Sequence, residues 1–392
     1  MTFVFKINNT TNIDSSAVIA SNTEISDKDK LWFDLNHEKP RIYHPIKLKW
    51  GFLNYGIGYD GFDNNISGFW TSYISIPISS QISTSTQVKV VIKDGEILLY
   101  TNNMNLENFN ISDFVFRYSI NTNKFWKYVD LLGSDIRIFD ETMEQTYFWI
   151  EKIDKFNREC VIWTKVNAGQ ETINIGFGNT DCIHSQYNDG SSVFNFFDDF
   201  IGNEIDKNKW YYGGSIKVEN SSVKMFPGKI QSKQSFSGNF IVNFKAMVTS
   251  NSYYHTDHIT VGLLDSDRSD GYGFWPFFRK DGVFQFYWRK PNYWQSIGVY
   301  SHWSPNQWVK IENIRFGNRF GTIIGDYDTD TMEFYLIESP SDVTIGDNIF
   351  FHCPRMWVEF NDGDGPFILD YIFVREIINE KITFDKPQIL DF

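Results

Sequence analysis

The chain has 392 residues and a mass of 46.0 kDa, which is enough for two or three domains that each bury a core. Hydrophobic residues make up 42% of it and charged residues 22%, a composition typical of globular rather than disordered proteins. The formal net charge of −13 argues against nucleic-acid binding and against docking on anionic lipid, because both need a basic surface.

Residues 1–9 lack the basic start and the apolar stretch of ~7–15 residues that mark a secretory signal peptide. No apolar run approaches the ~20 residues that a membrane-spanning helix needs. The three cysteines, Cys160, Cys182 and Cys353, lie far apart and form no Cys-x-x-Cys pair. We therefore expect a protein that is made in a reducing cytosol and does not insert into a membrane.

Short stretches of alternating polar and apolar residues dominate the chain, and aromatic residues reach 18% of it. Residues 87–100 predict a strand, a tight turn at Asp94 and Gly95, and a second strand. Residues 236–248 predict a strand with one apolar face, formed by Phe240, Val242, Phe244 and Ala246. Residues 277–288 predict another hairpin around an Asp-Gly pair. These patterns predict an all-β protein with no helix longer than about three turns.

Linker-like segments divide the chain into predicted regions. Residues 1–110 form a β-rich region to which we assign an anchoring or assembly role, and residues 111–195 form a β-sandwich domain. Residues 196–378 form a larger β-sandwich, and residues 379–392 form a C-terminal tail.

An ordered set of motifs runs through residues 111–195. Its members are Ser134-Asp135-Ile136-Arg137, Tyr147-Phe148-Trp149-Ile150-Glu151, Val161-Ile162-Trp163-Thr164-Lys165-Val166, Gly178-Asn179 and Val193-Phe194-Asn195-Phe196-Phe197-Asp198-Asp199-Phe200. This set resembles an uncharacterised β-sandwich family, domain of unknown function 2341, which also occurs fused to MotA/TolQ/ExbB-type proteins. The chain departs from the family pattern at Gly176 and Phe177, where a Tyr-Tyr pair is usual. The resemblance implies a fold and no catalytic residue.

The region after it opens with Phe197-Asp198-Asp199-Phe200, followed by Lys207 and Trp210, and closes with Asp370-Tyr371-Ile372-Phe373-Val374-Arg375. This opening and closing resemble the concanavalin A/laminin-G-like jelly roll. The resemblance implies that the first and last strands of the region lie side by side, so we expect Asp198 and Asp199 on a strand adjacent to that of Asp370. The fold class is therefore all-β, with several β-sandwiches and a C-terminal concanavalin A-like jelly roll.

Aromatic residues are densest between positions 272 and 308, and a sugar ring stacks well on such side chains. The predicted glycan-binding residues are Trp275, Tyr287, Trp288, Tyr293 and Trp294, with Arg289 and Asn292 as hydrogen-bond donors. The alternative is that these rings fill the core or a subunit interface, where aromatic residues are also enriched.

Oxygen-rich loops could hold a metal ion, and if one does, we expect one structural Ca²⁺ rather than a catalytic metal. The candidate ligands are Asp265, Asp267, Asp270, Asp198 and Asp199, and the favoured interpretation of these loops is that they are solvated turns. No catalytic residue is predicted. Glu204 and Asp206 begin the Glu-x-Asp-x-x-Glu pattern of jelly-roll glycosidases, but Lys209 occupies the third position.

These features favour a non-enzymatic virion structural protein, such as a phage or archaeal-virus head decoration, fibre or tail adhesin. Its jelly roll would bind glycan or a neighbouring subunit, its partners would be copies of itself and other assembly subunits, and it would lie on the virion surface. The alternatives are a glycoside hydrolase and a carbohydrate-binding module of a cell-surface protein. Nucleic acid is not an expected partner.

Overall fold

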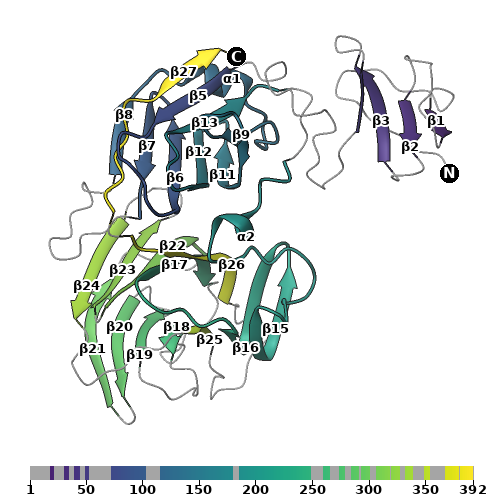
Figure 1. The fold of residues 1–392 in the computed structure, drawn as a ribbon. Coiled ribbons are helices and arrows are strands. Elements are labelled where there is room, and N and C mark those ends of the chain that lie inside the picture. The colour runs from purple at the N-terminus through teal and green to yellow at the C-terminus, as the bar shows by residue number, and fades with distance from the viewer. Residues whose placement is uncertain are drawn as a thin grey trace. The chain divides into compact units, whose positions relative to one another are not determined.

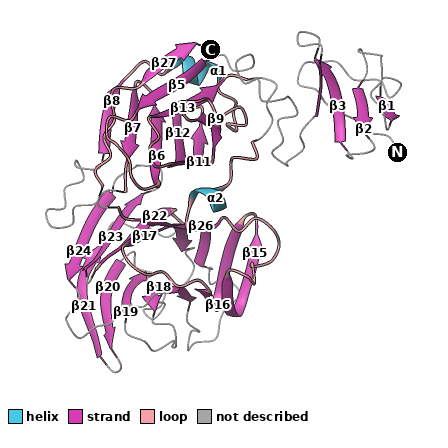
Figure 2. Ribbon diagram, viewed as in Figure 1, coloured by secondary structure: helices cyan, strands magenta, loops and turns pink. Residues whose placement is uncertain are grey.

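The computed structural model describes the residues 18–21, 31–34, 39–44, 49–52, 72–102, 115–179, 185–248, 259–264, 273–278, 284–290, 293–300, 306–317, 319–326, 332–338, 348–353, 367–378 and 380–391. Strands dominate this part of the chain (Figure 2). Its helices are α1 (Asn123–Tyr128) and α2 (Gly190–Val193), so the prediction of an all-β protein without long helices is confirmed for the described residues.

A four-stranded sheet comes first. It contains β1 (Val18–Ser21), β2 (Leu31–Asp34), β3 (Lys39–His44) and β4 (Lys49–Phe52). β1 pairs with β2 in parallel, and the remaining pairs are antiparallel.

The chain forms two compact units that interleave along the sequence. The first comprises Met1–Asn103, Asn110–Val193 and Glu380–Phe392, and the second comprises Met104–Phe109 and Phe194–Asn379. This division differs from the predicted boundaries at 110 and 379. The hairpin at Asp94 and Gly95 forms as predicted, but its first strand pairs with a strand of the region 111–195, so both belong to one sandwich.

The first unit contains two five-stranded sheets (Figure 1). One has the order β10 (Gln145–Thr146), β9 (Arg137–Phe139), β13 (Thr172–Phe177), β5 (Ser72–Pro77) and β27 (Gln388–Asp391). The other has the order β11 (Phe148–Asp154), β12 (Glu159–Val166), β6 (Thr86–Lys93), β7 (Glu96–Tyr100) and β8 (Val115–Ser119). On β5 the alternate residues Ile74 and Ile76 are fully buried, as expected for a strand with one face on a core, whereas almost all of β6 is buried, including Val88 and Val90.

The C-terminal segment is part of the first unit rather than a tail. β27 pairs with β5 along four residues, and Ile382 and Phe384 are buried. The backbone N–H and the hydroxyl of Ser83 donate hydrogen bonds of 2.7 and 3.1 Å to the Glu380 carboxylate. Local sequence did not predict this, because β5 precedes β27 by about 300 residues in the chain.

Motif residues of the first unit bond to one another and hold its loops. Asp135 accepts hydrogen bonds from the backbone N–H groups of Asp130 (2.9 Å) and Gly178 (2.7 Å), which joins two of the motifs. Trp163 Nε1 donates a 2.6 Å hydrogen bond to Glu151, which joins two others. These motifs therefore stabilise the fold.

The strands of the second unit form one continuous sheet, in which most strands follow one another as hydrogen-bonded neighbours. The order is β21 (Tyr293–Tyr300), β20 (Phe284–Lys290), β19 (Gly273–Phe278), β18 (Ile259–Leu264), β25 (Asn348–Cys353), β16 (Ser222–Ser232), β26 (Phe367–Glu376), β17 (Phe240–Val248), β22 (Val309–Phe316), β23 (Arg319–Asp326) and β24 (Met332–Glu338). β14 (Phe196–Asp198) pairs with β26, and β15 (Trp210–Glu219) pairs with β16. β16 pairs with both β25 and β26, so it links the two halves of the sheet.

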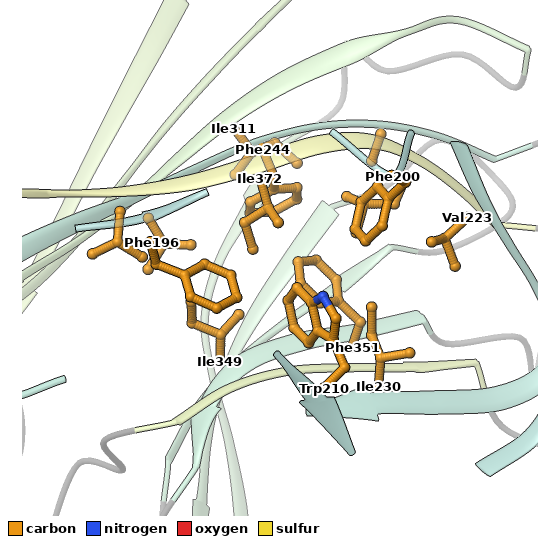
Figure 3. Close-up of a cluster of buried hydrophobic side chains, with 14 of the residues drawn as sticks. Phe196, Phe200, Trp210, Val223, Ile230, Phe244, Ile311, Ile349, Phe351 and Ile372 are labelled. Carbon is orange, nitrogen blue, oxygen red and sulfur yellow. The ribbon is translucent and has the colours of Figure 1, made fainter. Parts of the chain in front are cut away.

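The two halves enclose one apolar core, which makes this unit a β-sandwich. Phe244, Ile311 and Ile372 come from one half, and Trp210, Ile230, Ile349 and Phe351 come from the other (Figure 3). The predicted apolar face of residues 236–248 is confirmed, since Phe240, Val242, Phe244 and Ala246 all belong to this core. The predicted pairing of first and last strands is also confirmed, because Asp198 of β14 lies opposite Ile372 of β26, the strand that carries Asp370.

Candidate ligand-binding face

The strand register shows which residues lie on each face of one half of this sheet. This half contains β15, β16, β25, β18, β19, β20 and β21. Ile230 of β16 lies opposite Phe351 of β25, and both are fully buried in the core. Residues that lie directly opposite each other share a face, and successive residues alternate between faces. The adjacent pair of Gln231 and Phe350 therefore takes the other face, which we call the outer face.

The same reasoning extends to the aromatic strands, which lie side by side (Figure 1). Leu263 of β18 lies opposite Ile349 of the core and opposite Phe274 of β19, so the next residue, Trp275, takes the outer face. Tyr287 lies opposite Trp275. Arg289 follows two positions later on the same face, and Trp294 of β21 lies opposite it. The outer face thus contains Trp275, Tyr287, Arg289 and Trp294.

The other predicted binding residues have different positions. Trp288 lies opposite Phe274, on the face that carries the core. Lys290 follows Trp288 by two positions and therefore lies on the core face. Tyr293 lies opposite Lys290 and shares this face. Asn292 lies outside the described residues. The predicted set is therefore divided between the two faces, and only its outer-face members form one surface.

Tyr211 of β15 extends this surface at the other end of the sheet half. It lies opposite Gln231, on the outer face, and 61% of it is exposed. Lys233 Nζ lies 5.0 Å from the centroid of its ring. One row across the strands thus contains Tyr211, Gln231, Phe350, Gly262, Trp275, Tyr287 and Ser296. Six steps of ~4.8 Å between strands give the row a length of about 29 Å.

The sequence analysis missed Tyr211 and Gln231. Alternation within Trp210-Tyr211-Tyr212 indicates that Trp210 and Tyr211 lie on opposite faces, and burial of Trp210 confirms it. Local sequence does not predict which strand pairs with this hairpin. β16 pairs with β25, which lies more than 100 residues later in the chain. The row exists only because of that distant pairing.

Asp198 has a structural role that differs from the predicted metal ligation. Its Oδ1 accepts a 2.9 Å hydrogen bond from the Phe200 backbone N–H, and its Oδ2 accepts a 2.6 Å hydrogen bond from Trp210 Nε1. Burial raises the pKa of the neighbouring Asp199 carboxyl, and the Asp198 charge adds to this. Asp198 therefore holds the turn before β15, and Ca²⁺ binding by Asp198 and Asp199 stays a prediction.

The remaining predicted metal ligands, Asp265, Asp267 and Asp270, lie outside the described residues. Within the described ranges, no three His, Cys, Asp or Glu side chains come together in a way that would hold a metal ion. None of the helices described is long and apolar enough to cross a membrane.

The two carboxylates that begin the glycosidase pattern lie in a surface turn. The Glu204 side chain is 82% exposed and lies 3.8 Å from Lys207. Asp206 Oδ1 accepts a 2.8 Å hydrogen bond from the Asn208 backbone N–H, which closes the turn before β15. Both carboxylates therefore have local structural contacts, as expected for a turn.

Residues 132–213 match the family described as Domain of unknown function (DUF2341), which confirms the resemblance found in the motifs. The match begins in the first unit and ends in β15 of the second. No curated protein matches the chain.

Several solved structures resemble part of the chain. The Ca²⁺-bound exoplasmic/lumenal domain of VIP36 is 12% identical, with 50% of this chain and 95% of that chain covered and a TM-score of 0.38. Basic winged bean lectin with Tn-antigen is 9% identical, with 46% and 98% covered and a TM-score of 0.37. A prokaryotic β-1,3-1,4-glucanase from a mouse hindgut metagenome is 11% identical, with 47% and 99% covered and a TM-score of 0.36.

Proposed function

We propose that this chain is a non-enzymatic glycan-binding protein and that the outer face of the second unit binds the glycan. The observation that carries the proposal is the row across the strands, in which Trp275 and Tyr287 align with the exposed Tyr211. Aromatic rings with a polar edge offer an apolar surface for the C–H face of a sugar, and the neighbouring polar groups fix its orientation.

Glycines on the same face support this assignment. Gly262 occupies the row between Phe350 and Trp275, and Gly273 lies opposite Arg289. Gly213 of β15 is also on this face, and a Cβ built there would have only Lys229 Cε within 4 Å, at 3.9 Å. A glycine inside a strand is unfavourable for the strand itself and often marks a place where a ligand approaches the backbone closely. At Gly213 the missing side chain leaves open space beside Tyr211 on the same strand.

We also propose that copies of the chain assemble on a virion surface, with a cell surface as the alternative location. Weak contacts to single sugars become useful when linked copies bind together, which favours an assembled protein. The anchoring role predicted for residues 1–110 is proposed for residues 1–71, because the strands within residues 72–102 pair with strands of the region 111–195. Immunogold labelling of purified particles tests the location, and unlabelled particles would contradict it.

A glycan array tests the binding function. We expect the full-length chain to bind a defined group of glycans. Replacement of Tyr211 with Ala should weaken that binding about fivefold, which corresponds to ~1 kcal/mol for the loss of one aromatic contact. The matched control is Phe156→Ala in the first unit, because Phe156 is an aromatic residue with 91% exposure. Equal binding by both variants, or no glycan bound at all, would refute the proposal.

A further inference from the structure

The described strand positions of the outer face carry more basic than acidic residues, although the chain has 49 acidic and only 36 basic residues. On β15 the core residue Val218 lies between Lys217 and Glu219, so these two take the outer face, and Lys224 lies opposite Lys217. Lys217, Lys224, Lys229 and Arg289 are the basic residues at these positions, and Glu219 is the acidic one. The other described positions of this face are Tyr211, Gly213, Ser222, Gln231, Asn348, Phe350, His352, Thr260, Gly262, Leu264, Gly273, Trp275, Phe277, Gln285, Tyr287, Trp294, Ser296 and Val299.

Two lysines with exposed side chains lie beside Tyr211. Lys233 Nζ lies over the Tyr211 ring, and the Lys233 backbone N–H donates a 2.8 Å hydrogen bond to the Lys209 carbonyl, which fixes the chain there. Lys229 lies opposite Gly213, with its Cε close to the space above that glycine. Both side chains are exposed, and both lie at the same end of the row.

Other lysines of this unit are paired with carboxylates. Lys217 and Lys224 pair with Glu219, Lys245 pairs with Asp370, and Lys207 pairs with Glu204. Lys229 and Lys233 have no such ion pair within the part of the chain that the structure describes. Because both side chains are exposed, an anion that approaches Tyr211 can reach their charges.

We propose that the outer face selects an acidic glycan, with its sugar rings on the aromatic row and its carboxylate or sulfate groups beside Lys229 and Lys233. This inference rests on the proposed glycan-binding function and adds the chemical class of the ligand. A lysine ammonium is a compact charge that binds carboxylate and sulfate groups alike. The two lysine charges would also attract anionic sugars, which the net negative charge of the chain repels.

The test compares glycans that share a backbone and differ in charge. An array should contain neutral, carboxylated and sulfated forms of the same polysaccharides, including alginate and carboxyl-reduced alginate. We expect the full-length chain to prefer the charged forms, with binding that weakens as salt is raised. Lys229→Gln with Lys233→Gln should weaken binding to the charged form about fivefold. Lys381→Gln with Lys386→Gln is the control, since it removes the same charge from exposed lysines of the first unit.

The outcomes separate the two proposals. Preference for neutral glycans, or equal binding by the two double variants, would overturn the acidic-glycan inference and leave glycan binding intact. Absence of binding to every glycan would overturn the glycan-binding function and the inference with it. Preference for carboxylated over sulfated forms, or the reverse, supports the inference and identifies the acidic group.

Discussion

A buried charged cluster in the second unit shows how single residues hold together the half of the sandwich opposite the outer face. Arg375 Nη2 lies 2.8 Å from Glu312 Oε2, and Arg375 Nε donates a 3.0 Å hydrogen bond to Asn243. Asn243 Nδ2 in turn donates a 2.6 Å hydrogen bond to Glu312. The three residues come from β26, β22 and β17, so the cluster joins three neighbouring strands. A buried charge strongly destabilises the folded state when its ion-pair and hydrogen-bond partners are removed.

Removal of one partner should therefore cost much more than removal of both. We expect Glu312→Ala to destabilise the second unit by about 3–5 kcal/mol, because it leaves the Arg375 charge buried. Glu312→Leu combined with Arg375→Met should cost far less. Urea unfolding measures both changes, and equal losses for the single and double variants would contradict the interpretation.

The ion pairs of Glu219 with Lys217 and Lys224 give a dependence of stability on pH. Hydrogen bonds from Lys217 and Lys224 lower the pKa of Glu219 from 4.5 to about 2. A lowered pKa in the folded state contributes stability above the unfolded pKa of 4.5, and this contribution disappears as the pH falls to about 2. Glu219→Gln should thus lose less thermal stability over this range than the unmodified chain. Parallel losses in both proteins would show that the pair contributes nothing.

At the scale of elements, the C-terminal segment completes a sheet that begins about 300 residues earlier. Phe384 is 5% exposed and packs edge-on against Phe116 of β8, with ring centroids 5.5 Å apart. Tyr118 of β8 donates a hydrogen bond of 2.5 Å to the Phe384 carbonyl. The segment is therefore bound through both its side chains and its backbone.

Phe384→Ala should destabilise the first unit by about 3–5 kcal/mol, because it removes a buried aromatic ring. Leu390→Ala on β27 is the control, since Leu390 is 37% exposed and its loss should change stability by at most about 0.5 kcal/mol. Hydrogen exchange of β5 measures the effect, since opening of the segment exposes its amides. Unchanged exchange in Phe384→Ala would mean that the segment is dispensable.

The sequence predicted elements whose signals are local. The hairpin at Gly95 formed because a glycine there adopts a φ of +78°, as its turn requires. The apolar face of β17 followed from alternation alone. Pairings between distant strands were not predictable in this way, and they decide both the unit boundaries and the outer face. Trp275 and Tyr287 were found from composition, whereas their separation from Trp288 needed the register.

At the scale of the whole molecule, the second unit is inserted into the sequence of the first. The chain leaves the first unit after Val193 and returns to it at Glu380. Both ends of the insertion lie on neighbouring strands, since Asn195 donates a 3.0 Å backbone hydrogen bond to Val374 of β26. Adjacent ends are what an inserted domain needs in order to fold on its own.

Residues 194–379 expressed alone should therefore fold cooperatively, whereas residues 111–195 alone should not. The shorter piece lacks β5, β6, β7 and β27, and with them one of the two neighbours of each of β12 and β13. Circular dichroism with thermal unfolding distinguishes the two outcomes. A cooperative transition in residues 111–195 would show that the first unit does not need the distant strands.

Footprinting of the outer face tests the central claim most directly. A photoactivated carbene reagent labels exposed side chains of the full-length chain with and without a glycan identified on the array. The proposed function predicts that the bound glycan reduces labelling at Tyr211, Trp275 and Tyr287, while labelling of the exposed Phe156 stays constant. Unchanged labelling at these three aromatic residues, with protection elsewhere in the chain, would contradict glycan binding by the outer face.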